Sequence, residues 1–99
     1  MVRIVFITIS RACACTLTRC KKSEAALQKV LASYPNAPQM ERIDFSEEQD
    51  KARSLTQKHG VFMLPVALFL DGKNGLLDIL EGEFTEGDAK KALELYLGK

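Results

Sequence analysis

The stretch HGVFMLPVALFLDG, residues 59–72, carries the strongest fold signal in the chain. It begins with a His-Gly pair typical of a helix end, because glycine adopts the left-handed conformation of the position after a helix. After Pro65 it continues as the unbroken apolar run 66–70, which is typical of a strand buried on both faces. The turn 71–75 contains two glycines and favours a hairpin. We therefore expect a helix end, a buried strand and a hairpin in direct succession.

Apolar patterning predicts three further strands around this segment. They are expected at residues 2–9, 40–45 and 76–80, where β-branched and aliphatic side chains concentrate. Together with the strand at 66–70 they give four strands in one chain of 99 residues. A chain of this length is expected to form a single domain over residues 1–99.

Three helices are expected between and after these strands. The first follows the loop 10–15, with Thr16 or Thr18 as its N-cap, and ends at the two prolines in 35–38. The second runs from Ser46 to His59, because Ser46 and Gln49 match a capping box. The third is opened by residues 85–88, and its apolar positions are Ala89, Ala92, Leu93, Leu95, Tyr96 and Leu97.

The resulting order is β-α-β-α-β-β-α, which places the chain in the α/β class. A strand-helix-strand opening favours parallel strands, and the later hairpin adds an antiparallel pair. The simplest packing is a four-stranded mixed sheet covered by three helices.

Composition argues against nucleic-acid and membrane partners. Fourteen basic and thirteen acidic residues leave a net charge of +1, and the chain has no Trp. Phosphate binding requires a basic excess on one face. The apolar run near the start, residues 4–9, is too short for a signal-peptide core or a membrane span. We expect a cytoplasmic monomer without a cofactor.

Three cysteines, Cys13, Cys15 and Cys20, cluster where the first strand gives way to the first helix. In a reducing compartment such a cluster indicates redox chemistry or metal binding rather than structural disulfides. A helix N-terminus and nearby cations favour the reactive thiolate, and the flanking cations are Arg11, Arg19, Lys21 and Lys22. The alternative is three thiols packed as small apolar side chains.

The element order, the cysteine position and residues 59–72 together resemble thioredoxin. Residues 59–72 are similar to a thioredoxin stretch running Tyr-Gly-Ile, a short link, Ile-Pro-Thr, an apolar strand and a Gly turn. The resemblance covers essentially the whole chain. It implies a thioredoxin-like fold, a cis peptide bond before Pro65, and a proline that faces the cysteines.

The cysteine motif departs from that family. Thioredoxin has Trp-Cys-Gly-Pro-Cys, whereas this chain has C-x-C-x4-C and no C-x-x-C. Counted back from the end of the helix, Cys20 falls at the family's resolving position, which leaves Leu17 at its nucleophile position. The family's buried carboxylate has no counterpart in residues 3–9. A glutaredoxin-type glutathione site is not supported.

The resemblance implies a thiol-disulfide oxidoreductase that acts as a protein-disulfide reductase. Three pairings are possible: Cys15 with Cys20, Cys13 with Cys20, and Cys13 with Cys15, the last closing a strained ring. We expect Cys15 as nucleophile, Cys20 as resolving thiol and Cys13 as an additional thiol. Leu64 and Pro65 would hold the substrate chain, and the partners would be a protein disulfide and a reductase.

Two alternatives belong to other functional classes. Cys13, Cys15 and Cys20 are soft ligands suited to Cu(I), Zn(II), Hg(II) or trivalent arsenic. No fourth ligand lies nearby in the sequence, since the single histidine, His59, is expected to be a cation at a helix C-terminus. The third possibility is a thioredoxin-fold adaptor without turnover, because fold alone does not define activity.

Overall fold

The computed structural model describes residues 2–96, and Leu97 of the expected third helix lies outside them. The strands are β1 (Arg3–Thr8), β2 (Glu41–Asp44), β3 (Val66–Leu70) and β4 (Leu76–Glu81), and the helices are α1 (Ala14–Leu31), α2 (Gln49–Lys58) and α3 (Glu86–Tyr96). The predicted β-α-β-α-β-β-α order is confirmed, and β3 has the predicted bounds.

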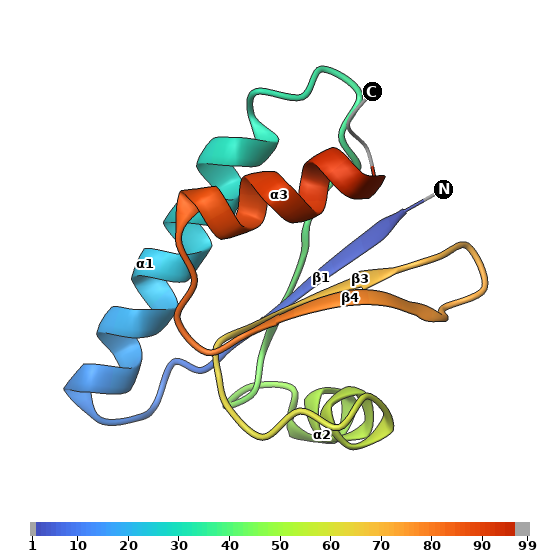
Figure 1. Ribbon diagram of the computed structural model, residues 1–99. Helices are drawn as coiled ribbons and strands as arrows, with labels where there is room; N and C mark the ends of the chain where they lie inside the picture. The colour runs from blue at the N-terminus through green and yellow to red at the C-terminus, as the bar shows by residue number, and fades with distance from the viewer. Residues whose placement is uncertain (1, 97–99) are drawn as a thin grey trace.

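The strands form one mixed sheet in the order β2-β1-β3-β4 (Figure 1). β1 is parallel to β2 and antiparallel to β3, and β3 is antiparallel to β4. In this register Ile7, near the end of β1, is paired with Val66 at the start of β3. The loop after β1 and the segment before β3 therefore meet at the same end of the sheet.

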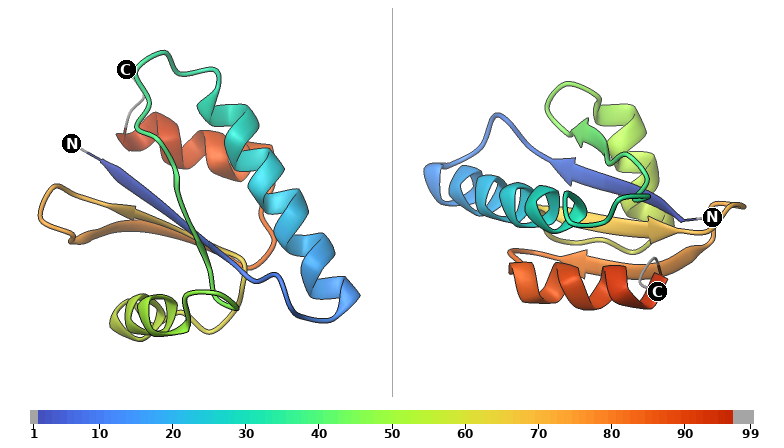
Figure 2. Two further views of the ribbon diagram at one scale, coloured as in Figure 1. Left: turned by 180° about the vertical axis from the view of Figure 1, so that it is seen from behind. Right: turned by 90° about the horizontal axis from the view of Figure 1, so that it is seen from above.

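Helices cover both faces of the sheet. α1 and α3 lie on one face and α2 on the other, as the views in Figures 1 and 2 agree. Alternate residues of β1 belong to separate cores, because successive side chains of a strand point to opposite faces. Ile4 and Phe6 pack with Leu27 and Leu93 under α1 and α3, whereas Val5 and Ile7 pack under α2.

Two helices begin elsewhere than predicted. α1 begins at Ala14 with Cys13 as its N-cap, so neither Thr16 nor Thr18 caps it. α2 begins at Gln49, so the predicted capping box at Ser46 is wrong. The Ser46 hydroxyl instead accepts a hydrogen bond from the backbone N–H of Arg11 at 3.0 Å. Long-range contacts have overridden the local capping preference in this loop.

The predicted end of the second helix and start of the third are confirmed. Gly60 has φ of +67° directly after the C-cap His59. Before α3, the Thr85 hydroxyl accepts from the Asp88 N–H at 3.1 Å, and the Asp88 carboxylate accepts from the Thr85 N–H at 3.0 Å. This reciprocal pair is a capping interaction that fixes the start of the helix.

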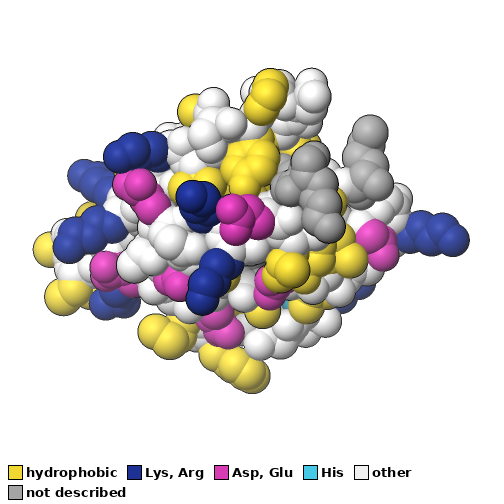
Figure 3. Space-filling model, turned by 45° about the horizontal axis from the view of Figure 1, so that its top comes forward, with side chains coloured by type: hydrophobic (Ala, Val, Ile, Leu, Met, Phe, Trp, Pro, Cys, Tyr) yellow, Lys and Arg dark blue, Asp and Glu magenta, His cyan; other side chains and the backbone are white. Residues whose placement is uncertain are grey.

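The surface carries both signs of charge. Figure 3 shows Lys and Arg side chains interspersed with Asp and Glu over the face that it presents. This arrangement agrees with the net charge of +1. Within residues 2–96, no helix is both long enough and apolar enough to cross a membrane.

Candidate functional site

Cys13 sits at the N-terminus of α1. Its backbone is extended, with φ −63° and ψ 159°, and its carbonyl accepts the first helical hydrogen bond from Leu17 at 3.0 Å. The first N–H groups of a helix lack partners within the helix and carry partial positive charge. A thiolate on the exposed Cys13 is therefore favoured by its position at the helix start.

Thr16 and Arg19 form a polar chain that ends at the Cys13 sulfur. Cys13 Sγ lies 3.2 Å from Thr16 Oγ1, and Arg19 Nη2 donates to the same oxygen at 3.2 Å. Because Thr16 Oγ1 accepts from Arg19, its own proton is free to point at the sulfur. Hydrogen bonds from Thr16, together with a contact from Cys15, lower the pKa of the Cys13 thiol from 9.0 to about 7.

The other two cysteines occupy different environments. Cys15 is exposed in the first turn of α1 and contributes to lowering the pKa of the Cys13 thiol. Cys20 is only 3% exposed. All three are free thiols. The structure therefore brings Cys13 and Cys15 together and buries Cys20 in the helix face against the protein.

Helix geometry decides which pairs of thiols can meet. Residues five apart in an α-helix are about 140° apart around the axis, with their Cα atoms about 8.7 Å apart. A disulfide requires Cα atoms within roughly 7 Å. Because α1 begins at Ala14, this separation applies to Cys15 and Cys20, the pair expected to work together. Residues two apart have Cα atoms about 5.4 Å apart, which is within disulfide range, although on an ideal helix their side chains point about 200° apart. Cys13 precedes the helix as its extended N-cap, so Cys13 and Cys15 form the closer pair, and their disulfide would close a strained ring.

The three thiols do not form a metal cluster. Across residues 2–96, no group of three or more His, Cys, Asp or Glu side chains is placed to hold a metal ion. His59 is the C-cap of α2, as expected from its position. Burial, followed by the charge of Lys58, lowers the pKa of His59, which disfavours the cation that the sequence suggested.

The segment before β3 faces the loop that carries Cys13. The Leu64–Pro65 peptide bond is cis, and the Pro65 carbonyl accepts from the Gly82 N–H at 2.8 Å. One oxygen of Glu81, Oε2, accepts from two consecutive N–H groups, Phe62 at 2.5 Å and Met63 at 2.8 Å. The carboxylate thereby fixes the backbone that leads into Leu64 and Pro65.

A shallow groove of about 380 Å³ separates this segment from α1. It is lined by Ile9 and Ala12 from the loop after β1, Thr16 and Arg19 from α1, and residues 62–64. Arg19 is the charged member of this set. The groove therefore runs between the first turns of α1 and the segment before Pro65. Cys13 does not line it, but Cys13 Sγ contacts Thr16, which does.

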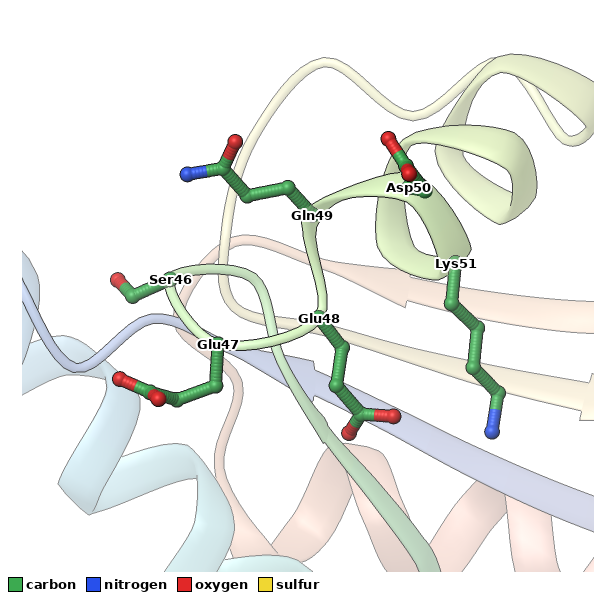
Figure 4. A pocket seen from close by; sticks show the side chains of 6 residues that line it. All are labelled: Ser46, Glu47, Glu48, Gln49, Asp50 and Lys51. Atoms are coloured by element: carbon green, nitrogen blue, oxygen red, sulfur yellow. The ribbon is translucent and has the colours of Figure 1, made fainter.

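The loop that carries Cys13 is anchored to the start of α2. Arg11 forms an ion pair with Glu47 at 2.6 Å and donates to the Ser46 carbonyl at 2.7 Å. The sequence had placed Arg11 among the cations beside the thiols, but its charge is paired with Glu47. Ser46 and Glu47 also line a second hollow with the residues up to Lys51, shown in Figure 4, and no cysteine lines it.

These features define a thioredoxin-like fold, and solved structures agree. The chain matches the germline-specific thioredoxin Deadhead of Drosophila melanogaster at 20% identity and TM-score 0.71, covering 96% of this chain and 80% of that one. It matches thioredoxin from Aeropyrum pernix at 21% identity and TM-score 0.69, covering 96% and 75%. Thioredoxin-2 of a malaria parasite matches at 18% identity and TM-score 0.69, covering 96% and 82%. No protein-family model and no curated protein sequence matches the chain.

Sequence reasoning missed the partners that surround the cysteines. It assigned Thr16 to a helix cap and Arg19 to a set of flanking cations, and it gave Glu81 no role. The available signal was the three-residue spacing of Cys13, Thr16 and Arg19, which places them on one side of a helix. The spacing indicates a shared side of the helix only if α1 begins at Ala14, because only then do all three residues belong to its first turns.

Proposed function

We propose that this protein is a thiol-disulfide oxidoreductase in which Cys13 attacks the substrate and Cys15 resolves the mixed disulfide. The observation that carries the proposal is the placement of Cys13 Sγ at a helix N-terminus, 3.2 Å from Thr16 Oγ1. A thiol with a pKa near ambient pH is well suited to attack a disulfide, since it combines thiolate population with nucleophilicity. The fold shared with thioredoxins supports the same class of reaction.

The reaction consists of two exchanges. The Cys13 thiolate attacks one sulfur of a substrate disulfide, a new S–S bond forms, and the other substrate sulfur leaves as a thiolate that takes a proton from water. Cys15 then loses its proton and attacks Cys13 Sγ, which releases the second substrate thiolate. The substrate gains two electrons, the Cys13–Cys15 pair is oxidised, and an external dithiol reduces that pair again.

This assignment differs from the pairing of Cys15 with Cys20 expected from the motif. Cys20 is buried and lies five residues after Cys15 in α1. A disulfide between these two residues would therefore require the first turns of α1 to unwind. Cys13 and Cys15 are both exposed and lie two residues apart at the start of α1. A soft-ion site of three thiolates is the less favoured function, because Cys20 does not join the other two.

The roles are separated by single substitutions assayed with a small neutral disulfide, hydroxyethyl disulfide, and an external dithiol. We expect Cys13→Ser to abolish reduction. In a parallel incubation without the external dithiol, which would itself reduce a mixed disulfide, Cys15→Ser should attack once and accumulate as a mixed disulfide that mass spectrometry detects. Cys20→Ala is the matched control, and it should turn over as the unmodified protein does.

Two outcomes would overturn the assignment. Turnover that survives in Cys13→Ser would show that another thiol attacks. A mixed disulfide that accumulates in Cys20→Ala, with turnover intact in Cys15→Ser, would restore Cys20 as the resolving thiol. Circular dichroism of each variant establishes that loss of activity is not loss of fold.

A further inference from the structure

We propose that the groove next to Thr16 and Arg19 selects extended peptide disulfides that carry an acidic side chain beside their reactive cysteine. Arg19 would bind this acidic side chain. The inference rests on the proposed function and goes further by naming the substrate class. Its structural basis is an apolar wall formed by residues 62–64 opposite a single guanidinium, with Cys13 in the same helix turn as Thr16.

The apolar wall is presented to solvent rather than folded into the core. Phe62 is 92% exposed and Met63 is 54% exposed, an unusual degree of exposure for large apolar side chains. Their backbone is nevertheless fixed, since Glu81 accepts hydrogen bonds from both N–H groups. A fixed backbone lowers the entropy lost on binding, so Phe62 is arranged to contact a partner chain.

Arg19 supplies the charge at this groove. Its Nη2 donates to Thr16, and its Nε is buried without a hydrogen-bond partner among the described residues. The ion pairs found within residues 2–96 use Arg3, Arg11, Lys29 and Arg42, and none includes Arg19. A guanidinium has five N–H donors, and with Nε buried and one Nη2 donor on Thr16, the remaining terminal N–H groups are those that would meet a substrate carboxylate. Charge complementarity therefore favours an acidic substrate residue.

The direction in which the groove runs suits an extended peptide. It runs from the turn of α1 beside Cys13 to the backbone before Pro65, and an extended chain can lie along exposed backbone while its side chains enter neighbouring subsites. Its cysteine would lie at Cys13, an apolar side chain at Phe62 and a carboxylate at Arg19. The other carboxylate near this segment, Glu81, is already engaged by two backbone N–H groups.

The test uses three synthetic peptides that contain the same disulfide and the same apolar residue but carry Glu, Gln or Lys beside the cysteine. The second-order rate of reduction is measured for the unmodified protein, Arg19→Gln and Lys21→Gln. Lys21 lies on the same helix, is exposed and does not line the groove, so it is the matched charge control. Because Arg19 also touches Thr16, the rate ratio between peptides is compared within each protein, which cancels changes in thiol reactivity.

We expect the Glu peptide to react about fivefold faster than the Lys peptide, the size of effect given by a partly exposed ion pair. The ratio should fall to about one in Arg19→Gln and stay unchanged in Lys21→Gln. Phe62→Ala should lower the rates of all three peptides relative to the rate with hydroxyethyl disulfide.

Equal rates for the three peptides in the unmodified protein would overturn the proposal, as would a preference that persists in Arg19→Gln. Both results leave the exchange chemistry standing if hydroxyethyl disulfide is reduced normally. Failure to reduce hydroxyethyl disulfide as well would reject the proposed function itself.

Discussion

Cys13 Sγ lies 3.2 Å from Thr16 Oγ1 across the first turn of α1, and Thr16 in turn accepts a hydrogen bond from Arg19. Because Thr16 Oγ1 accepts from Arg19, its own proton is free to point at the sulfur. Charge-assisted hydrogen bonds of this kind stabilise the ionised form of the acceptor. Thr16, three residues after Cys13, therefore lowers the pKa of the Cys13 thiol.

Replacing Thr16 by the isosteric Val should raise the pKa of Cys13 from about 7 towards 9.0, because the hydrogen bond to the thiolate is lost. At pH 7 the alkylation rate should fall about fivefold as the thiolate fraction drops. The pH profile of alkylation by iodoacetamide measures the change. Thr16→Ser should restore the profile, and an unchanged midpoint in Thr16→Val would remove Thr16 from the mechanism.

Glu81→Gln should weaken the hold on the backbone of Phe62 and Met63, because a neutral amide oxygen is a poorer acceptor than a carboxylate. The KM for a peptide disulfide should rise severalfold while the rate with hydroxyethyl disulfide stays the same. The exposed Glu83→Gln is the control for removal of a nearby charge. A loss that is equal for both substrates would indicate general destabilisation instead.

Ser23→Ala should lower the free energy of unfolding by about 1–3 kcal/mol. The buried Ser23 hydroxyl oxygen accepts from the Phe84 N–H at 3.1 Å, and alanine leaves that donor without a partner. This bond ties α1 to the segment between β4 and α3. Urea denaturation measures the loss, and the exposed Ser54→Ala should change stability by less than about 0.5 kcal/mol.

Stability should decrease as the pH falls below 6.5, the ordinary pKa of histidine. His59 has a folded-state pKa below its ordinary 6.5, chiefly because of burial, so the unfolded chain binds more protons in this range. Stability from such a group is present above the unfolded pKa and is lost as the pH falls. Urea midpoints at several pH values should show a shallower slope in His59→Gln than in the unmodified protein.

Much of the fold was predictable because its signals are local. The apolar run at residues 66–70 predicted the bounds of β3. Residues 85–88 were predicted to open the last helix, and Thr85 and Asp88 do pair at its start. The start of α1 was not predictable in the same way. Cysteine is a poor sequence signal for an N-cap, and Thr16 has a stronger capping preference.

The error of three residues at the start of α1 changed the assignment of the thiols. A helix that began after Cys15 would have left that thiol in a loop, free to approach Cys20. A helix that begins at Ala14 fixes the angular positions of Cys15 and Cys20 and separates them. Glu81 is 19 residues from Phe62 and 18 from Met63, and no sequence pattern predicts the hydrogen bonds between them.

Because Ile7 of β1 pairs with Val66 of β3, the groove can form only after β3 has been synthesised. A nascent chain that has emerged as far as Gly60 already contains all three cysteines, yet it lacks residues 62–64 and Pro65. Its thiols can then meet oxidants and one another before any substrate groove exists. Under the proposed function, selectivity would be acquired late in synthesis, when β3 joins β1, and thiol chemistry before that point would depend on the surrounding medium.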